Sequence, residues 1–307
     1  TMFKYNSNFG YASAISYVIV ILVVVLSFIQ MKVGARMTKK NNEYFTVRYI
    51  NYIKYHSIFP FYWMIVAATN KSVDVSKATL MIGSHIVETL SRLIASDLNY
   101  FGAFKNSIII AVVTTTLAMI ISSAAGYAFE DTSQKARDRV FSVILVSMMI
   151  PFAALMIPLF QLFGNFNTIP ILSWIGINTP GSVIIIAIAT AFLIFSSSEH
   201  SDHFQRFVEA ARLDGLGEFG IFTKIFIPTM KSTYAAAIIV TFMTSWNNYM
   251  WPLISLQSPE KKTLPLILSA LGSSYTPDYG MMMVAVVIAT IPTALIFFLM
   301  QKNLYRE

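Results

Sequence analysis

The sequence predicts an all-α integral membrane protein, and three of its features lead to this prediction. Of its 307 residues, 56% are hydrophobic and only 12% are charged, whereas soluble domains carry about 25% charged residues. The mean hydropathy is +0.63, and apolar runs long enough to cross a bilayer core of about 30 Å recur along the chain. The net charge of +7 does not indicate nucleic acid, because the basic residues lie in short loops beside apolar runs.

The apolar stretches, taken in order, predict one extra N-terminal span followed by about six further spans. A basic cluster between residues 32 and 54 follows the first stretch, which places this segment on the cytoplasmic side. Pro151 and Pro158 are expected to kink the stretch that contains them, and Pro170, Pro180 and Gly181 are expected to interrupt the stretch 169–195 early. Residues 85–95 are expected to form an external amphipathic helix. The predicted spans are 11–31, 58–68 (a short one), 106–129, 140–163, 169–195, 233–256 and 281–300.

A polar segment with small residues interrupts this pattern on the cytoplasmic side. The run Glu209-Ala210-Ala211 is expected near the start of a helix, where the helix dipole favours an anion and the alanines leave a flat surface for a close neighbour. Gly215 permits a turn after this helix, and Pro228 ends the segment that follows. Three residues separate Ala211 from Gly215, and nine separate Gly215 from Ile225.

This spacing resembles the EAA loop of ATP-binding-cassette (ABC) importer permeases, with Ile227 in place of a leucine. From Phe59 onward the chain resembles the permease subunits of carbohydrate importers of the maltose type. The resemblance implies the type I ABC importer permease fold, with a coupling loop at residues 207–228 that docks into an ATPase subunit. The ATPase-coupling residues that it implies are Glu209, Ala210, Ala211, Gly215, Ile225 and Pro228.

The same resemblance implies the partners of the chain. They are a second homologous permease subunit, two ABC ATPase subunits and an extracytoplasmic solute-binding protein, all at the cytoplasmic membrane of a prokaryote. The glycines between Gly215 and Gly220 lack the Lys and Ser/Thr of a phosphate-binding loop. We therefore expect this chain to bind no cofactor and its partners to use ATP and Mg²⁺. We expect no metal site, no nucleic-acid contact and no enzyme activity, since no catalytic set of side chains is recognisable.

A second polar run lies inside an apolar stretch: Trp246, Asn247, Asn248 and Tyr249. Asparagine at bilayer depth is costly unless it is hydrogen-bonded. Amides bond sugar hydroxyls and aromatic rings stack on sugar rings, so these four residues are the candidate substrate pathway. Hydrogen bonding between helices, with an aromatic belt near the interface, is an equally good interpretation of the residues alone. The run also resembles the corresponding segment of sugar permeases.

The predicted function is therefore that of a permease subunit that moves sugars or oligosaccharides across the cytoplasmic membrane. The near-absence of charge within the spans favours a neutral solute over ions or protons. One alternative is a permease of the same superfamily for another solute, such as amino acids or phosphate. A membrane-embedded enzyme and a passive channel are alternatives of a different class.

The domain organisation has one unusual feature at its start. Residues 1–36 resemble the C-terminal span of the partner permease, and residues 37–307 form the expected permease domain. We hypothesise that two neighbouring reading frames are joined near Met37. A shifted reading frame is also our hypothesis for the unusually polar residues 196–206, which follow directly on an apolar stretch.

Overall fold

The computed structural model describes residues 57–130, 149–196 and 202–304, together with isolated residues between 131 and 148. The chain divides into two compact units, Thr1–Trp63 and Met64–Glu307, and the second contains every helix from α4 to α16. All regular elements of the described residues are helical. The predicted first span, the boundary at residues 36 and 37 and the polar residues 197–201 lie outside the described residues.

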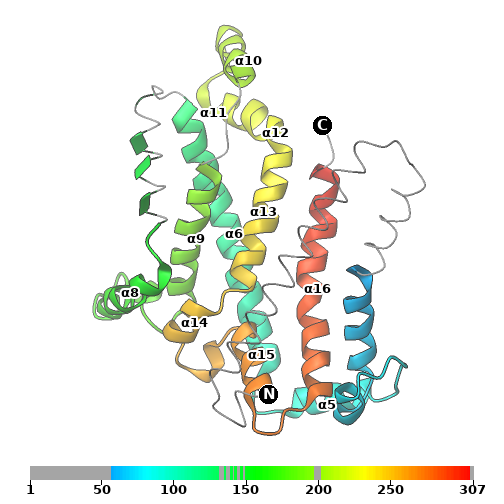
Figure 1. Ribbon diagram of the computed structural model, residues 1–307. Helices are drawn as coiled ribbons and strands as arrows, with labels where there is room; N and C mark the ends of the chain where they lie inside the picture. Colours follow the sequence, from blue (N-terminus) through cyan, green and yellow to red (C-terminus); the bar gives the residue numbers. More distant parts are fainter. Residues whose placement is uncertain are drawn as a thin grey trace, which may run out of the picture. The chain divides into compact units, whose positions relative to one another are not determined.

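The helices of the second unit form a bundle of upright helices with shorter elements at both ends (Figure 1). A short apolar helix, Ser57–Ala68, precedes them in the chain. Their bounds are α4 Ser72–Ser76, α5 Ile86–Ala95, α6 Tyr100–Glu130, α8 Phe152–Phe166, η1 Ser173–Ile175, α9 Pro180–Ser196, α10 Asp202–Leu213, α11 Glu218–Ile221, η2 Phe222–Phe226, α12 Ile227–Thr229, α13 Lys231–Trp246, α14 Met250–Ser255, η3 Pro259–Lys261, α15 Leu264–Ser273 and α16 Tyr279–Leu304.

Two of the described helices, α6 and α16, are each long and apolar enough to cross a membrane. They confirm the predicted spans 106–129 and 281–300, and α5 confirms the short helix predicted at 85–95. The stretch 169–195 contains a shorter span, which confirms the early interruption predicted from Pro170, Pro180 and Gly181. Turns and η1 occupy its first part, so that α9 begins only at Pro180 and has 17 residues, at the lower end of the usual range for a span.

Two predicted spans are interrupted. In the stretch 233–256, α13 ends at Trp246 and α14 begins at Met250. The segments Glu218–Thr229 and Lys231–Ser255 meet at 77°, and the described residues contain a third span only if this bent pair crosses as one. The stretch 140–163 is not one helix, because a turn and a bend at residues 149–150 separate its first part from α8. Pro151 explains this break, since proline disfavours helical geometry in the preceding residue.

Helix α6 is the centre of the unit and packs against α9, α13, α15 and α5. One face carries small buried residues at helical spacing, and the opposite face carries exposed aliphatic side chains. Small residues allow neighbouring backbones to approach closely within a membrane. Tyr100 ties α6 to α16, because its hydroxyl donates to the carbonyl of Ala285 at 2.6 Å. The small face comprises Ala103, Ser107, Ala111, Thr114, Ala118 and Ser122, and the exposed face includes Val112, Val113, Leu117 and Ile120.

At the start of α16, Asp278 joins three helices. Its Oδ1 accepts from the backbone N–H of Met281 at 3.1 Å, which caps α16, and its Oδ2 accepts from Arg92 of α5 at 2.8 Å. The hydroxyl of Ser72 in α4 also donates to this carboxylate. Burial raises the pKa of Asp278, but the hydrogen bonds from Ser72 and Met281 and the charge of Arg92 outweigh it, so the pKa lies below its ordinary value.

Replacing Asp278 by alanine removes the cap and the ion pair together. We expect the free energy of unfolding to fall by about 1–2 kcal/mol, the usual cost of losing a cap. Asp278→Asn is the matched control, because asparagine caps as well as aspartate but leaves Arg92 without an ionic partner. Thermal unfolding of the purified protein measures both, and an alanine variant as stable as the unmodified protein would contradict the assignment.

The lowered pKa also predicts the direction of the pH dependence. A carboxylate whose pKa is lower in the folded than in the unfolded protein stabilises the fold. This contribution is complete above the pKa of the unfolded state and is lost as the pH falls through the pKa of the folded state. The difference in melting temperature between the unmodified protein and Asp278→Asn should therefore be largest near neutral pH and disappear in acid.

Candidate functional site

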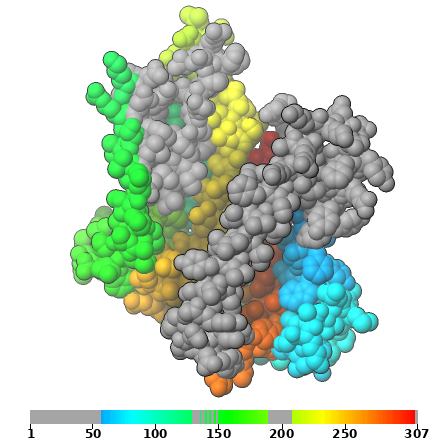
Figure 2. All heavy atoms as spheres, viewed as in Figure 1, coloured from blue at the N-terminus to red at the C-terminus, as the bar shows by residue number. Residues whose placement is uncertain are grey.

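The segment from α10 to α12 lies at the end of the unit opposite α5 and α15 (Figure 1). In Figure 2 its yellow-green atoms stand at the edge of the visible face, beyond those of α13. The backbone N–H of Leu216 donates to the carbonyl of Ala211 at 3.0 Å, and that of Gly215 to Arg212 at 3.1 Å. This is a Schellman motif, which needs a left-handed residue after the helix. Gly215 supplies it with a φ of +79°, so the predicted turn is confirmed.

The predicted coupling residues of α10 differ in exposure. Glu209 and Ala210 are exposed, whereas Ala211 is only 5% exposed. The helix begins at Asp202, so Glu209 lies in its second half. The expectation that the helix dipole favours an acid near a helix start does not apply to Glu209, because that effect is confined to the first turn. Of the two alanines, only Ala210 lies on the outer surface of the loop.

Two large apolar side chains on either side of the Gly215 turn were missed by the sequence analysis. Leu213 is 90% exposed and Phe219 is 81% exposed. Apolar side chains of this size at such exposure, rimmed by polar residues, mark contact surfaces. Their apolar character within an otherwise polar loop was the available signal.

The second half of the motif holds the loop to the bundle. Residues 222–226 form a π-helical turn, η2, an arrangement that is frequent at functional sites. Phe226 and Ile221 are fully buried, Ile225 is half-buried, and Pro228 stands in the first turn of α12. The predicted stop at Pro228 corresponds to the 77° bend that follows α12, because the chain leaves helical geometry at Met230.

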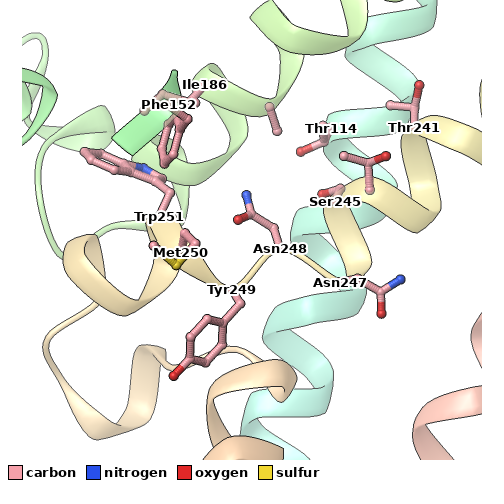
Figure 3. Close-up of a pocket in the computed structure, with 12 residues that line it drawn as sticks. Thr114, Phe152, Ile186, Thr241, Ser245, Asn247, Asn248, Tyr249, Met250 and Trp251 are labelled. Atoms are coloured by element: carbon pink, nitrogen blue, oxygen red, sulfur yellow. The ribbon is translucent and has the colours of Figure 1, made fainter. Parts of the chain in front are cut away.

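A cavity of about 370 Å³ lies beside the residues that separate α13 from α14. Figure 3 shows the residues around it, with Asn248 directed toward Phe152 and Thr114. None of the residues that line it is charged. They are Thr114 of α6, Phe152 of α8, Ile186 and Ala187 of α9, Thr241, Thr244 and Ser245 of α13, and Asn247, Asn248, Tyr249, Met250 and Trp251 at the break and in α14.

The structure brings three of the four predicted pathway residues to this cavity. Asn248 and Tyr249 are half-buried, and the hydroxyl of Tyr249 lies 3.2 Å from that of Ser269 in α15. Asn247 is exposed, and its amide donates to the carbonyl of Met243 at 2.9 Å. Trp246 lies elsewhere: it is buried in the core of the unit and packs on the rings of Phe104 and Phe242.

Two hydroxyl groups in the wall were not found from the sequence. The Oγ1 of Thr114 and the Oγ of Ser245 are buried and have no hydrogen-bond partner, although Thr114 is 0% and Ser245 8% exposed. Most buried polar groups in proteins are paired, so an unpaired one needs an explanation. Both residues line the cavity, but neither oxygen is exposed, so each hydroxyl pairs with a ligand only if its side chain rotates into the cavity.

Asn178 forms hydrogen bonds with the residues that follow α14. It adopts a left-handed φ of +63°, and its Oδ1 accepts from the backbone N–H groups of Gln257 and Ser258 at 3.1 and 3.0 Å. Its amide nitrogen donates to the Oγ of Ser258 at 2.7 Å. Next to it, the indole of Trp251 donates to the carbonyl of Ser182 in α9 at 3.1 Å. The short helix α14 is therefore held against α9.

Replacing Asn178 by alanine removes these side-chain bonds and places a Cβ in a left-handed position. We expect a loss of about 1–3 kcal/mol in the free energy of unfolding, because hydrogen bonds worth about 0.5–1.5 kcal/mol each are lost and alanine is strained at this φ. Asn178→Gly is the matched variant, since glycine accepts the positive φ and loses only the hydrogen bonds. Thermal unfolding should rank the unmodified protein above Asn178→Gly and Asn178→Gly above Asn178→Ala; any other order contradicts this role.

Comparison with known proteins adds findings of three kinds: a family, two relatives and a fold. The family described as "Binding-protein-dependent transport system inner membrane component" matches residues 118–307. The lactose transport system permease protein LacG of Rhizobium radiobacter is 43% identical over 248 residues, which cover 80% of this chain and 88% of that protein. The arabinooligosaccharides transport system permease protein AraQ of Bacillus subtilis (strain 168) is 37% identical over 204 residues, 66% of this chain and 70% of that protein.

The third finding concerns the fold. A chain in the crystal structure of a bacterial ABC transporter involved in the import of the acidic polysaccharide alginate matches with a TM-score of 0.62. The match has 18% sequence identity and covers 84% of this chain and 94% of that chain. At this identity the likeness establishes the fold, which is the predicted all-α type I importer permease.

Proposed function

The chain belongs to the family of binding-protein-dependent transport system inner membrane components, and on this premise we propose that it moves neutral sugars or oligosaccharides as a permease subunit of an ATP-driven importer. It is a multi-pass protein of the cytoplasmic membrane. The relatives named for lactose and for arabinooligosaccharides support this substrate class.

The chemistry of the cavity favours a neutral solute. Its lining offers hydroxyl groups, an amide and aromatic rings, with no charged side chain. A buried charge is costly without an opposite charge or a metal, so phosphate or an amino acid finds no suitable partner there. A sugar ring presents many hydroxyl groups at once. Asn248 is placed to pair with them, and Thr114 and Ser245 can do so after a rotation of their side chains.

We assign energy coupling to the loop 207–228. Glu209, Ala210 and the exposed Leu213 form the face of α10 that docks on an ATPase subunit, while Ile225 and Pro228 lie where the loop joins α13. The full importer contains this chain, a second homologous permease, two ATPase subunits and an extracytoplasmic binding protein. The ATPase subunits use ATP and Mg²⁺, and this chain binds no cofactor and catalyses no reaction of its own.

The path from motor to substrate runs along one helix. α13 begins directly after the bend that follows the loop and ends at the break beside the cavity. With 16 residues and 1.5 Å per residue, it spans about 24 Å. A movement of α10 that accompanies closure of the ATPase dimer is thereby passed to Thr241 and Ser245 in the cavity wall. The cavity then opens outward, accepts sugar, and opens inward after hydrolysis.

The two asparagines at the break provide a matched test of the sugar site. Asn248→Ala should raise the KM for sugar uptake by about tenfold or more, because hydrogen bonds to the sugar are lost in a buried site. Asn247→Ala should have little effect, since its amide is exposed and bonded to Met243 within its own helix. Uptake of labelled sugar into proteoliposomes containing the whole importer measures both. Equal effects of the two variants would count against the site.

The glycines of the loop provide a matched test of coupling. Gly215→Val places a β-branched residue at a φ of +79°, which costs roughly 1–2 kcal/mol or more and reorients α10. We expect uptake to fall strongly while the subunit remains inserted. Gly217→Ala should be tolerated, because Gly217 has a φ of −76° and a Cβ there meets nothing within 4 Å.

Crosslinking supplies the decisive readout for docking. A photoreactive group at position 213 should capture the ATPase subunit in the assembled importer. Failure to capture it, together with normal uptake by Gly215→Val, would refute the coupling role of the loop.

A further inference from the structure

The C-terminal end of α6 contacts the loop 207–228 through a series of side chains that are not among the predicted coupling residues. The carboxylate of Glu218, the first residue of α11, accepts from two donors. Arg212 of α10 donates its Nε to Oε1 at 2.9 Å, and the hydroxyl of Tyr127 in α6 donates to Oε2 at 2.5 Å. One carboxylate therefore joins the coupling helix to the central helix of the unit.

The aromatic ring of Tyr127 makes a second contact with the same loop. Its centroid lies 5.4 Å from that of Phe222 and 5.4 Å from that of Phe226, both edge-to-face, and these two phenylalanines stack on each other. They are the first and last residues of the π-helical turn η2. Tyr127 is thus held by its ring to the base of the loop and by its hydroxyl to Glu218.

Resting on the function proposed above, we propose that Glu218 and Tyr127 are positioning residues that transmit the movement of the coupling helix into α6. The loop then acts on both walls of the cavity. Thr114 stands on α6, thirteen residues before Tyr127, a distance of about 20 Å along the helix. Thr241 and Ser245 stand on α13, which continues from the other end of the loop.

The exposure of the ion pair favours a positioning role over a stabilising one. The side chains of Arg212 and Glu218 are 41% and 59% exposed, and exposed ion pairs contribute little to folding stability. The pair spans the turn between α10 and α11, where Gly215 and Gly217 leave the backbone unusually free. It therefore sets the angle of α10 relative to α11 without being needed for the fold.

The hydrogen bonds from Arg212 and Tyr127 lower the pKa of Glu218. The carboxylate consequently keeps its charge at every pH above the ordinary range of glutamate. The contact is therefore constant at cytoplasmic pH, as a mechanical connection requires, and does not act as a pH switch.

The test uses the complete importer in proteoliposomes and measures sugar transported per ATP hydrolysed. Tyr127→Phe removes the hydroxyl and keeps the ring, and Glu218→Gln removes the charge and keeps the shape. Each should lower the ratio by about threefold to tenfold, the usual range for mutations along a coupling network. The double variant should resemble Glu218→Gln alone, because the loss of the carboxylate charge weakens its bonds to both Arg212 and Tyr127, and Tyr127→Phe removes only the second of these. Glu260→Gln, which changes an exposed glutamate of η3 outside the loop, is the control and should leave the ratio unchanged.

The outcomes separate this inference from the proposed function. Unchanged ratios in Tyr127→Phe and Glu218→Gln, with a reduced ratio in Gly215→Val, would overturn the inference alone. Unchanged ratios in all three would overturn the proposed function of the loop as well. Loss of importer assembly or of melting temperature in Glu218→Gln, without a change of the ratio in the remaining complexes, would show a merely structural role and also overturn the inference.

Discussion

A helix within lipid must satisfy its own backbone hydrogen bonds, because no water is available to replace them. The site depends on this constraint, since a span can be interrupted only where protein covers the break. At the break after α13, the N–H groups of Asn247 and Asn248 still donate to Met243 and Ser245. The following half-helix is held to α9 by Trp251. The interruption is thus stabilised on both sides, and it leaves polar side chains beside a cavity at bilayer depth.

Close packing around α6 gives this arrangement its function. The small face of α6 allows α9 and α13 to approach, so that Thr114 and Ser245 face one cavity with their hydroxyl groups unpaired. The same two helices, α6 and α13, reach the coupling loop at their other ends, through Tyr127 and through the bend after α12. In the function proposed above, the sugar and the ATPase subunit therefore act on the same two rigid helices, over about 20 Å.

Several expectations drawn from residue patterns were correct, and the failures have identifiable causes. The turn at Gly215 was predictable because few other residues accept a positive φ. The spans at α6 and α16 were predictable from uninterrupted apolar length. Glu209 was misplaced because α10 begins seven residues earlier, at Asp202. In the stretch 140–163 the kink predicted at Pro151 is a full break between helices, whereas Pro158 lies inside α8.

The sequence by itself determined the membrane class, the family and the turn at Gly215, because these depend on composition and on local spacing. It also located Asn247 to Tyr249 as the exceptional polar run of a span. Only the tertiary structure decided that Trp246 belongs to the core and that the side chain of Asn248, rather than that of Asn247, is directed into the cavity (Figure 3). It alone also revealed the positions of four residues that the sequence analysis did not select: Thr114, Asn178, Tyr127 and Glu218. These residues meet partners far away in the chain, and such contacts arise from how the helices pack, which no local pattern encodes.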